Sequence, residues 1–441
     1  MDKEVKDEED LREISLDLHS YYGGKTEVVP KCPVRDLDDI NIWYTPGVAE
    51  PCKEIHKDSI KSFDYSNRGN TIAVVSDGSR VLGLGDIGPE ASLPVMEGKS
   101  LLFKFLGAVD AFPLSLDVKD EDEIISTVKN LSPSLGGVNL EDIESPKCFR
   151  ILKRLREEID IPVWHDDQQG TALVTIAGLM GGLKVVEKSI DNIKLVIVGS
   201  GAAGINITKY AIKSGVKPEK ILMVDSKGIL NTERKDLDPS SYKYQWASKT
   251  NPGNESGNIS NAMEEADVCI AASTPGPGVI SEKGVNKMAD DSIVFAEANP
   301  VPEINPVKAK EAGAKIVGTG RSDYPNQINN SLGFPGVFRG ALEVGARKIS
   351  DEMCISAAKA IAERAEEIGL NEDFIIPKMS DLETYVKEAV AVGEKAKDQG
   401  LARKNITKKE IEEQARYKLK RSRTQNEILI ENGVIKIPEE D

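Results

Sequence analysis

The sequence predicts an α/β protein in three parts: an N-terminal α/β region, a second α/β region built on a doubly wound parallel sheet, and a helical C-terminal segment. Short apolar runs without polar alternation recur between helical stretches, which is typical of strands buried on both faces of a parallel sheet. One run ends in a glycine-rich turn that opens a helix. Because 441 residues exceed what one core usually holds, we expect several domains, spanning residues 1–165, 166–340 and 341–441.

The N-terminal region begins with a charged, helical stretch over residues 1–35 and then alternates between strands and helices. The short apolar runs predict strands, and the longer runs of 3.6-residue periodicity predict helices. The expected strands are 71–78, 80–88, 111–118 and 161–167, and the expected helices are 94–106, 120–131 and 145–159.

The second region follows a long apolar helix expected over residues 170–186. Five buried strands are predicted, with helical or loop segments between them, and residues 238–260 are polar enough to indicate a loop. Beyond residue 341 the chain is helical and highly charged. The five strands are 194–201, 221–228, 266–274, 292–299 and 314–322.

The bulk composition excludes several classes of protein. A formal net charge of −16 repels nucleic acid and anionic membrane surfaces, so we expect neither as a partner. No apolar run is long enough to span a bilayer, and the N-terminus carries no signal-peptide pattern. Five scattered cysteines without a CxxC pair fit free thiols in a reducing compartment, so a cytoplasmic location is expected.

A glycine motif marks the expected dinucleotide site. Gly199, Gly201 and Gly204 have the G-x-G-x-x-G spacing directly between a strand and a helix, with Ala202 and Ala203 inside the motif. The first two glycines allow a tight turn and a close approach of backbone N–H groups to a pyrophosphate, and the third lets the helix pack against the strand.

Three residues at the end of the next strand, which we expect to end in Asp225, bear on the choice of cofactor. Asp225 lies where a carboxylate binds the ribose hydroxyls of NAD, and it would repel the 2′-phosphate of NADP. Ser226 and Lys227 follow at once and could instead accept that phosphate. Both cofactors therefore stay open, with NADP slightly favoured.

Two acidic pairs are candidates for a metal site. Asp166 and Asp167 come directly after a strand, at the edge where open α/β sheets bind ligands. Glu141 and Asp142 precede a helix, so complementing the helix dipole is an alternative explanation for them. Adjacent carboxylates are costly without a nearby cation, and three of them suit Mg²⁺ or Mn²⁺ rather than zinc.

Seven segments between residues 44 and 336 resemble motifs of the malic enzyme family, in family order. The chain length is similar to the smaller bacterial and archaeal form of this family. The segments are YTPGVAEPC, RVLGLGDIGPEASLPVMEGK, NLEDI, HDDQQGTA, GSGAAG, EANP and NQINNSLGFPG.

The resemblance implies a role for each matching residue. Tyr44 would be the general acid, Lys99 the general base and Asp166 the acid that supports the lysine. Arg80 would pair with a malate carboxylate, and Asn299 and Asn330 would lie at the substrate and the nicotinamide. The metal ligands would be Glu141, Asp142 and Asp167.

These roles make chemical demands on the site. Lys99 can accept the C2 hydroxyl proton of malate only if its pKa falls well below about 10.4, and we expect burial beside the metal and Arg80 to lower it. A metal would stabilise the enolate left after loss of CO₂. The phenol of Tyr44 suits protonation of that enolate at C3.

Three alternatives share parts of this pattern. A malolactic-type enzyme would use the same site but retain its cofactor and release lactate. An amino-acid dehydrogenase would not need the three carboxylates, and a non-catalytic dinucleotide-binding regulator would not need Tyr44 or Lys99. The resemblance also implies a homodimer or larger assembly, with the N-terminal helix and helical tail as expected interfaces and Tyr44 reaching a neighbouring subunit's site.

Overall fold

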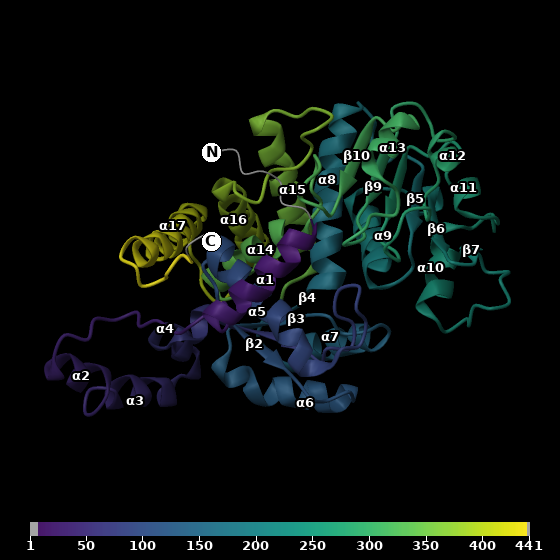
Figure 1. The fold of residues 1–441 in the computed structure, drawn as a ribbon. Helices are drawn as coiled ribbons and strands as arrows, with labels where there is room; N and C mark the ends of the chain where they lie inside the picture. Colours follow the sequence, from purple (N-terminus) through teal and green to yellow (C-terminus); the bar gives the residue numbers. More distant parts are fainter. Residues whose placement is uncertain (1–7, 439–441) are drawn as a thin grey trace.

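The computed structural model describes residues 8–438 and has two open parallel sheets joined by a buried helix (Figure 1). The first sheet has the order β2-β1-β3-β4, with every neighbouring pair parallel. Its strands are β1 (Thr71–Ser76), β2 (Asp110–Ser115), β3 (Gly137–Leu140) and β4 (Val163–His165), and its helices are α5 (Gly88–Gly107), α6 (Glu121–Leu131) and α7 (Lys147–Glu158).

The second sheet has the order β10-β9-β8-β5-β6-β7 and is parallel except for the two-residue strand β7. Its central position is β5, from which the chain builds outwards in both directions, so it is the predicted doubly wound sheet. The strands are β5 (Leu195–Val198), β6 (Ile221–Asp225), β7 (Gly228–Ile229), β8 (Val268–Ala271), β9 (Ile293–Ala296) and β10 (Ile316–Thr319). The helices in this region are α9 (Ala202–Ser214), α10 (Tyr242–Thr250), α11 (Ile259–Ala262), α12 (Glu282–Val285) and α13 (Pro306–Glu311).

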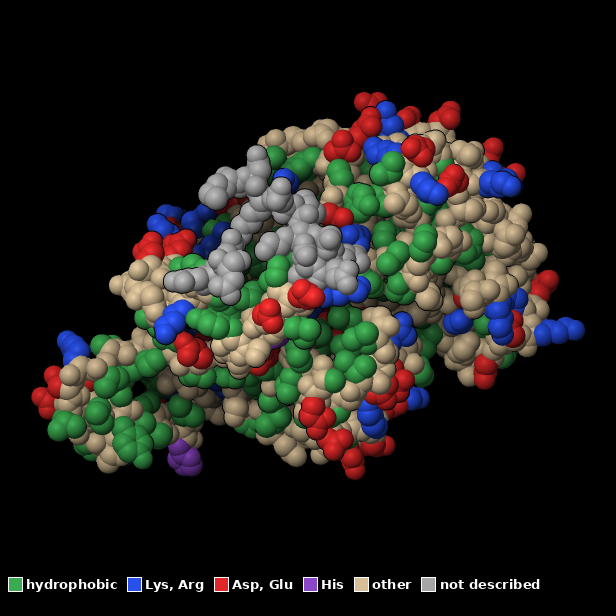
Figure 2. Space-filling view, in the orientation of Figure 1, with side chains coloured by type: hydrophobic (Ala, Val, Ile, Leu, Met, Phe, Trp, Pro, Cys, Tyr) green, Lys and Arg blue, Asp and Glu red, His purple; other side chains and the backbone are tan. Residues whose placement is uncertain are grey.

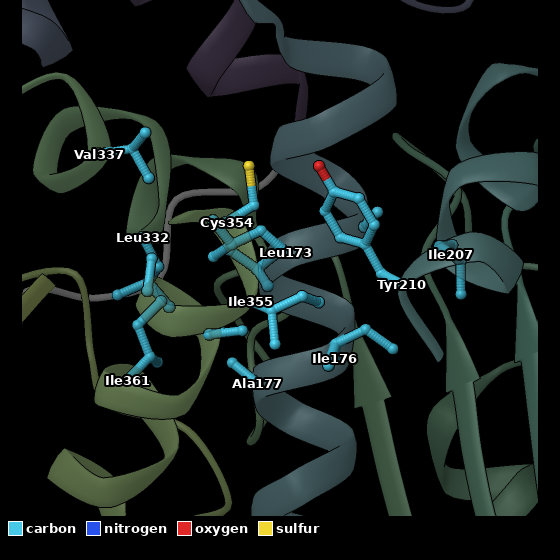
Figure 3. Packing of buried hydrophobic residues seen from close by; sticks show 14 of the residues in the cluster. Leu173, Ile176, Ala177, Ile207, Tyr210, Leu332, Val337, Cys354, Ile355 and Ile361 are labelled. Atoms are coloured by element: carbon cyan, nitrogen blue, oxygen red, sulfur yellow. The ribbon is translucent and has the colours of Figure 1, made fainter. Parts of the chain in front are cut away.

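Helix α8 (Thr171–Val185) lies in the main core, because it is apolar on every side and must be covered all round. Figure 3 shows its residues Leu173, Ile176 and Ala177 among side chains of α9 and α15, including Tyr210 and Ile355. No helix among residues 8–438 is both long and apolar enough to cross a bilayer.

The C-terminal helices pack on elements of both sheet regions. Helix α15 lies on α8, α16 lies on α14 and α15, and α17 lies on α16, α14 and α5. These helices are α14 (Phe334–Glu343), α15 (Asp351–Ile368), α16 (Leu382–Asp398) and α17 (Lys408–Glu431).

The N-terminal part is helical but does not join either sheet. It contains α1 (Glu8–Tyr22), α2 (Leu37–Trp43), α3 (Ala49–Lys57) and the short α4 (Ser62–Tyr65). Figure 1 shows α2 and α3 projecting from the body as an arm. Residues 1–7 of the predicted lead-in lie outside the described residues.

Two local predictions were wrong, and one strand was missed. Residues 80–88 form a loop with a single bridge from Val81 to Gly85 rather than a strand, because Leu82 and Gly85 have positive φ and Leu84 is exposed. The four-residue strand β3 was not predicted. The polar segment 238–260 contains α10, which begins at an N-cap on Ser241.

Candidate active site

The acidic pairs meet because β3 and β4 are neighbours in the first sheet. Leu140 pairs with His165 at the carboxyl ends of these strands, so the residues that follow each strand lie side by side. Glu141 and Asp142 therefore follow a strand directly and are not in the first turn of α7, which begins only at Lys147. The helix-dipole explanation of this pair is wrong.

Lys99 is the cation at the centre of this cluster. It lies on α5 and is buried, with Nζ 2.6 Å from Asp166 Oδ2 and 3.0 Å from Glu141 Oε1. The ammonium also lies 4.5 Å from the ring centroid of Phe334. Burial holds the lysine in one place, and the two carboxylates fix the direction of its ammonium group.

Asp166 is fully buried and accepts hydrogen bonds on both carboxylate oxygens. Trp164 Nε1 donates to Oδ1 at 3.0 Å, while Lys99 and Asn330 Nδ2 donate to Oδ2. On the neighbouring strand, Asn139 Nδ2 donates to Glu141 Oε2 at 2.8 Å. Sequence reasoning missed Trp164 and Asn139, although each precedes its acid by two residues, the spacing that places strand side chains on one face.

Glu141, Asp142 and Asp167 could together hold a metal ion. Each offers a carboxylate oxygen, and these oxygens lie within 4.8 Å of one another. Asp142 Oδ2 is buried without a hydrogen-bond partner among the described residues. The backbone N–H of Asp142 donates to Asp167 Oδ2 at 3.1 Å, which ties the two loops together. An oxygen-only set of this kind fits Mg²⁺ or Mn²⁺.

Because these acids are buried close together, their pKa values are raised. Burial and the neighbouring Asp167 carboxylate raise the pKa of Asp142 to about 8. Burial also raises the pKa of Glu141 well above its ordinary value, with further contributions from Asp166 and Asp167. A divalent cation would stabilise the ionised form of these close carboxylates, so the donor set fits the expected Mg²⁺ or Mn²⁺.

The expected fall in the pKa of Lys99 is not what the protein alone produces. Burial lowers this pKa, but the carboxylates of Asp166 and Glu141 outweigh burial and raise it above its ordinary value. Arg80, which was expected to lower it, is exposed and is not among the largest influences on the pKa of Lys99. The lysine is therefore a charged ammonium in the protein alone.

Arg80 belongs to a loop that is tied to the acidic loop by several hydrogen bonds. Its backbone N–H donates to the carbonyl of Asp142 at 3.0 Å, and the N–H of Glu144 donates to Ser79 Oγ at 3.0 Å. Asp77 accepts from Ser79 and forms a 2.5 Å ion pair with Lys147. These contacts place the backbone of Arg80 beside the acidic loop.

The glycine loop follows β5 as predicted. Gly199 has φ of +111°, and a Cβ there would overlap the carbonyl oxygen of Ala272. A Cβ on Gly204 would overlap the carbonyl oxygen of Gly199, so this glycine lets α9 pack against the loop. Gly201 faces open space, where a ligand can approach the backbone of Ala202 and Ala203 at the start of α9.

Asp225 ends β6 as predicted, but its carboxylate is already bound. Arg234 donates to both oxygens at 2.8 and 3.1 Å, and Lys243 Nζ lies 2.9 Å from Oδ2. Lys227 pairs instead with Asp236 at 3.0 Å. Neither Arg234 nor Lys243 was predicted, because they follow Asp225 by 9 and 18 residues and no local pattern marks them.

A hollow of about 430 Å³ opens beside Asp225. Ser226 and Lys227 line one part of it, and Gly257, Gly278 and Ser281 line other parts. It therefore lies at the carboxyl edge of the second sheet, on the β6 side of the glycine loop.

Two predicted site residues do not join the cluster around Lys99. Tyr44 lies between α2 and α3 on the arm, and its side chain is 69% exposed. Asn299 follows β9 and is exposed, beside Gly320 of the neighbouring loop. A Cβ on Gly83 would lie 4.0 Å from the carbonyl oxygen of Asn299, so the Arg80 loop and the Asn299 loop face each other across the two sheet regions.

The chain matches known proteins over most of its length. Residues 23–156 match the family model of the malic enzyme N-terminal domain, and residues 168–397 match that of the malic enzyme NAD binding domain. A bifunctional malic/malolactic enzyme of Bacillus subtilis is 49% identical over 406 residues, covering 92% of this chain and 98% of the relative. An NAD-dependent malic enzyme of Geobacillus stearothermophilus is 50% identical over 385 residues, covering 87% of this chain and 79% of the relative.

The fold agrees with a solved structure as well. The crystal structure of Entamoeba histolytica malic enzyme has a TM-score of 0.94 at 44% sequence identity, covering 97% of this chain and 90% of that one. Two family models that together span most of the chain, and relatives near 50% identity over 98% and 79% of their lengths, agree with the motifs and with the geometry. The chain belongs to the malic enzyme family.

Proposed function

We propose that the protein oxidises and decarboxylates (S)-malate to pyruvate and CO₂ while reducing NAD⁺ or NADP⁺. One observation carries the proposal: the buried Lys99–Asp166 pair lies directly beside the carboxylates of Glu141, Asp142 and Asp167. A base next to a divalent-metal site is what removal of a hydroxyl proton and loss of CO₂ from a 2-hydroxy acid require. The malic enzymes among the relatives support the same reaction.

In this proposal the metal is Mg²⁺ or Mn²⁺, held by Glu141, Asp142 and Asp167. When bound, it would withdraw electrons from the C2 oxygen and stabilise the enolate formed as CO₂ leaves. It would also neutralise Glu141, one of the two carboxylates that raise the pKa of Lys99. The lysine could then lose its proton and accept one from malate, with its amino group positioned by Asp166, which in turn accepts a hydrogen bond from Asn330.

The remaining substrate contacts are assigned by position. Arg80 stands on the loop tied to Asp142, where its guanidinium can pair with a malate carboxylate. Asn299 lies on the loop after β9 and Asn330 begins a 3-10 turn, and we propose that both contact the substrate or the nicotinamide. We also propose that the domain boundaries lie at residues 165 and 340. We further propose a cytoplasmic location, because the five cysteines are free thiols.

Either dinucleotide can be accommodated by the geometry around Asp225. Arg234 and Lys243 neutralise this carboxylate, so its repulsion of a 2′-phosphate is weak. We therefore propose that NADP⁺ is accepted, with cations supplied by Lys227, which lines the hollow, and by Lys243, which pairs with Asp225 at its edge.

Kinetics with both cofactors would test this choice. Lys243→Ala should lower the NADP/NAD ratio of kcat/KM, because a charge-assisted contact to phosphate contributes about 1.5–3 kcal/mol. Lys249→Ala, which changes an exposed lysine stacked on Trp246 of the same helix, is a matched control. An unchanged ratio in both Lys227→Ala and Lys243→Ala would contradict the assignment.

Tyr44 is proposed to act in the site of a partner subunit. The arm that carries it exposes several apolar side chains, and Figure 2 shows hydrophobic residues gathered there. An exposed apolar surface of this kind indicates a protein contact. The exposed arm residues are Leu37, Ile40, Ile42, Trp43, Tyr44 and Val48.

The helical tail is the other expected interface. It carries a hollow of about 570 Å³ along α17, beside Tyr417, Ile428 and Leu429.

Complementation tests both the assembly and the shared site. Tyr44→Phe and Lys99→Ala chains, each inactive alone, should regain part of the activity when mixed and reassembled. Light scattering should give a mass of at least twice 48.0 kDa. Full inactivity of mixed assemblies, or a monomer at working concentration, would contradict the sharing.

Product analysis tests the reaction itself. Malate with Mg²⁺ or Mn²⁺ should yield pyruvate and one NAD(P)H for each malate, and a chelator should abolish turnover. Lactate without net NAD(P)H would indicate the malolactic alternative, which the relative named a bifunctional malic/malolactic enzyme keeps open. Full turnover by metal-free protein in excess chelator would overturn the metal assignment.

A further inference from the structure

Glu297 is a buried acid that the proposed mechanism does not use. It is the first residue after β9, and its backbone N–H donates to the carbonyl of Ala271 at the end of β8 at 2.9 Å. Only 9% of the residue is exposed. Its carboxyl oxygens lie 2.8 and 2.9 Å from the hydroxyl of Thr175 on α8, and no lysine or arginine forms an ion pair with it among residues 8–438.

The hydrogen bonds of Glu297 compensate its charge only weakly. The Thr175 hydroxyl donates to the carboxyl group, but it also lies 2.7 Å from the carbonyl oxygen of Thr171. Because a hydroxyl has a single hydrogen, the two acceptors compete for it. An ionised Glu297 is therefore stabilised by no more than a shared hydrogen bond from this side chain.

The position of Glu297 relative to the dinucleotide follows from the order of the strands. The glycine loop follows β5, and Asp225 with its hollow lies on the β6 side of β5. An extended dinucleotide whose pyrophosphate lies at α9 and whose adenosine lies by β6 must direct its nicotinamide the opposite way, over β8 and β9. Glu297 begins the loop at the end of β9, and Asn299 lies two residues further along that loop.

We propose that Glu297 sets the relative affinity of the site for oxidised and reduced dinucleotide through the charge of the nicotinamide ring. The oxidised ring is a cation and the reduced ring is neutral, so an ionised carboxylate nearby favours NAD(P)⁺ and a neutral carboxyl group does not. The inference rests on the proposed dinucleotide-dependent reaction and adds a residue to it.

The groups that face Glu297 support this assignment. Thr175 on α8 and the backbone of β8 and β10 are uncharged neighbours. Glu303 is the charged group that acts on Glu297, and its own carboxylate accepts from Ser273 and the N–H of Ala298. Burial raises the pKa of Glu297 to about 8, and Glu303 adds to this effect while Thr175 opposes it. Glu297 therefore changes charge as the pH rises from neutral to weakly alkaline values.

Binding measurements without malate test the proposal. The dissociation constants of NAD⁺ and NADH, and of the NADP pair, are measured by fluorescence titration and competition between about pH 6.5 and pH 9. In the unaltered protein the preference for the oxidised form should rise by on the order of 3- to 10-fold over this range, since one nearby charge is gained. Glu297→Gln should flatten the change, whereas Glu311→Gln, an exposed acid on α13, should leave it intact.

A second variant keeps the test decisive if Glu297→Gln does not fold. Thr175→Val removes the hydroxyl that lowers the pKa of Glu297, so the midpoint of the change should move to higher pH. The same profile in Glu297→Gln and in the unaltered protein, or no movement of the midpoint in Thr175→Val, would overturn the proposal. Failure of every dinucleotide to bind would instead overturn the proposed function.

Discussion

Removing one metal ligand should stabilise the metal-free protein, which is the opposite of what a change in a well-packed site usually does. The variant is Asp142→Asn. In the metal-free site Asp142 is buried, its Oδ2 has no hydrogen-bond partner among residues 8–438, and carboxylate oxygens of Glu141 and Asp167 lie within 4.8 Å. Two unit charges at that separation repel each other by about 3 kcal/mol at an effective dielectric constant of about 20. Asparagine has nearly the same shape and carries no charge.

The pH dependence gives the sign of the effect. The folded-state pKa of Asp142 is raised to about 8, above the ordinary 3.8. Between these values the unfolded chain has released the proton and the folded protein still holds it. The stability that Asp142 contributes is therefore fully present below the unfolded pKa and is lost as the pH rises through the folded pKa. We expect the advantage of Asp142→Asn to grow by about 1–3 kcal/mol between pH 5 and pH 8.

The assay is urea unfolding of chelator-treated protein, followed by tryptophan fluorescence at several pH values. Added Mg²⁺ should stabilise the unaltered protein by mass action and should have little effect on Asp142→Asn. Glu144→Gln is the matched control, because this acid is in the same loop but its side chain is exposed. Lower stability of metal-free Asp142→Asn at pH 8, or equal stabilisation of both proteins by Mg²⁺, would refute the reasoning.

Two further predictions concern the reaction and the cofactor. Lys99→Ala should lower malate oxidation and oxaloacetate reduction by on the order of 10²–10⁴-fold, whereas Tyr44→Phe should spare oxaloacetate reduction and block tritium exchange into pyruvate. Equal loss of both partial reactions in Tyr44→Phe would show that the acid is misassigned. Gly204→Ala should weaken dinucleotide binding at least about tenfold, because its Cβ would displace the Gly199 carbonyl. Gly201→Ala, where a Cβ meets open space, should fold normally, and unfolding of Gly201→Ala would argue against this account of the loop.

Local patterns in the sequence predicted those elements whose signal is local. The strands of the second sheet are continuous apolar runs, and the glycine loop lies between one of them and a helix, so both were confirmed. The prediction of a strand over residues 80–88 was wrong because the leucines of this segment alternate with glycines, a pattern that fits a strand and a loop equally well. Helix α10 was hidden by the proline and polar residues that flank it.

The acidic part of the site was predicted from the family resemblance, and strand order explains why its residues meet. Glu141 and Asp167 were expected together because the family resemblance joined them, and the pairing of β3 with β4 gives the physical reason. The capture of Asp225 by Arg234 and Lys243 depends on how a 17-residue stretch folds back, which no periodicity encodes. The raised pKa of Lys99 in the metal-free protein was not predicted either, because it depends on two carboxylates that follow the strands β3 and β4.

Tyr44 shows why motif matching and geometry answer different questions. The motif identifies Tyr44, but this residue lies on an exposed arm, where the described residues of its own chain do not form an active site around it. The same arm exposes Trp43, Ile42 and Leu37, and leaving such side chains in water forgoes roughly 1.5–3 kcal/mol for each one that a partner could bury. Association of two subunits would therefore bury this surface. In our proposal it would also bring Tyr44 of one subunit to Lys99 of the other. On this argument, weakening the arm by Leu37→Ser should reduce assembly and malate decarboxylation together, while leaving dinucleotide binding at the glycine loop unchanged.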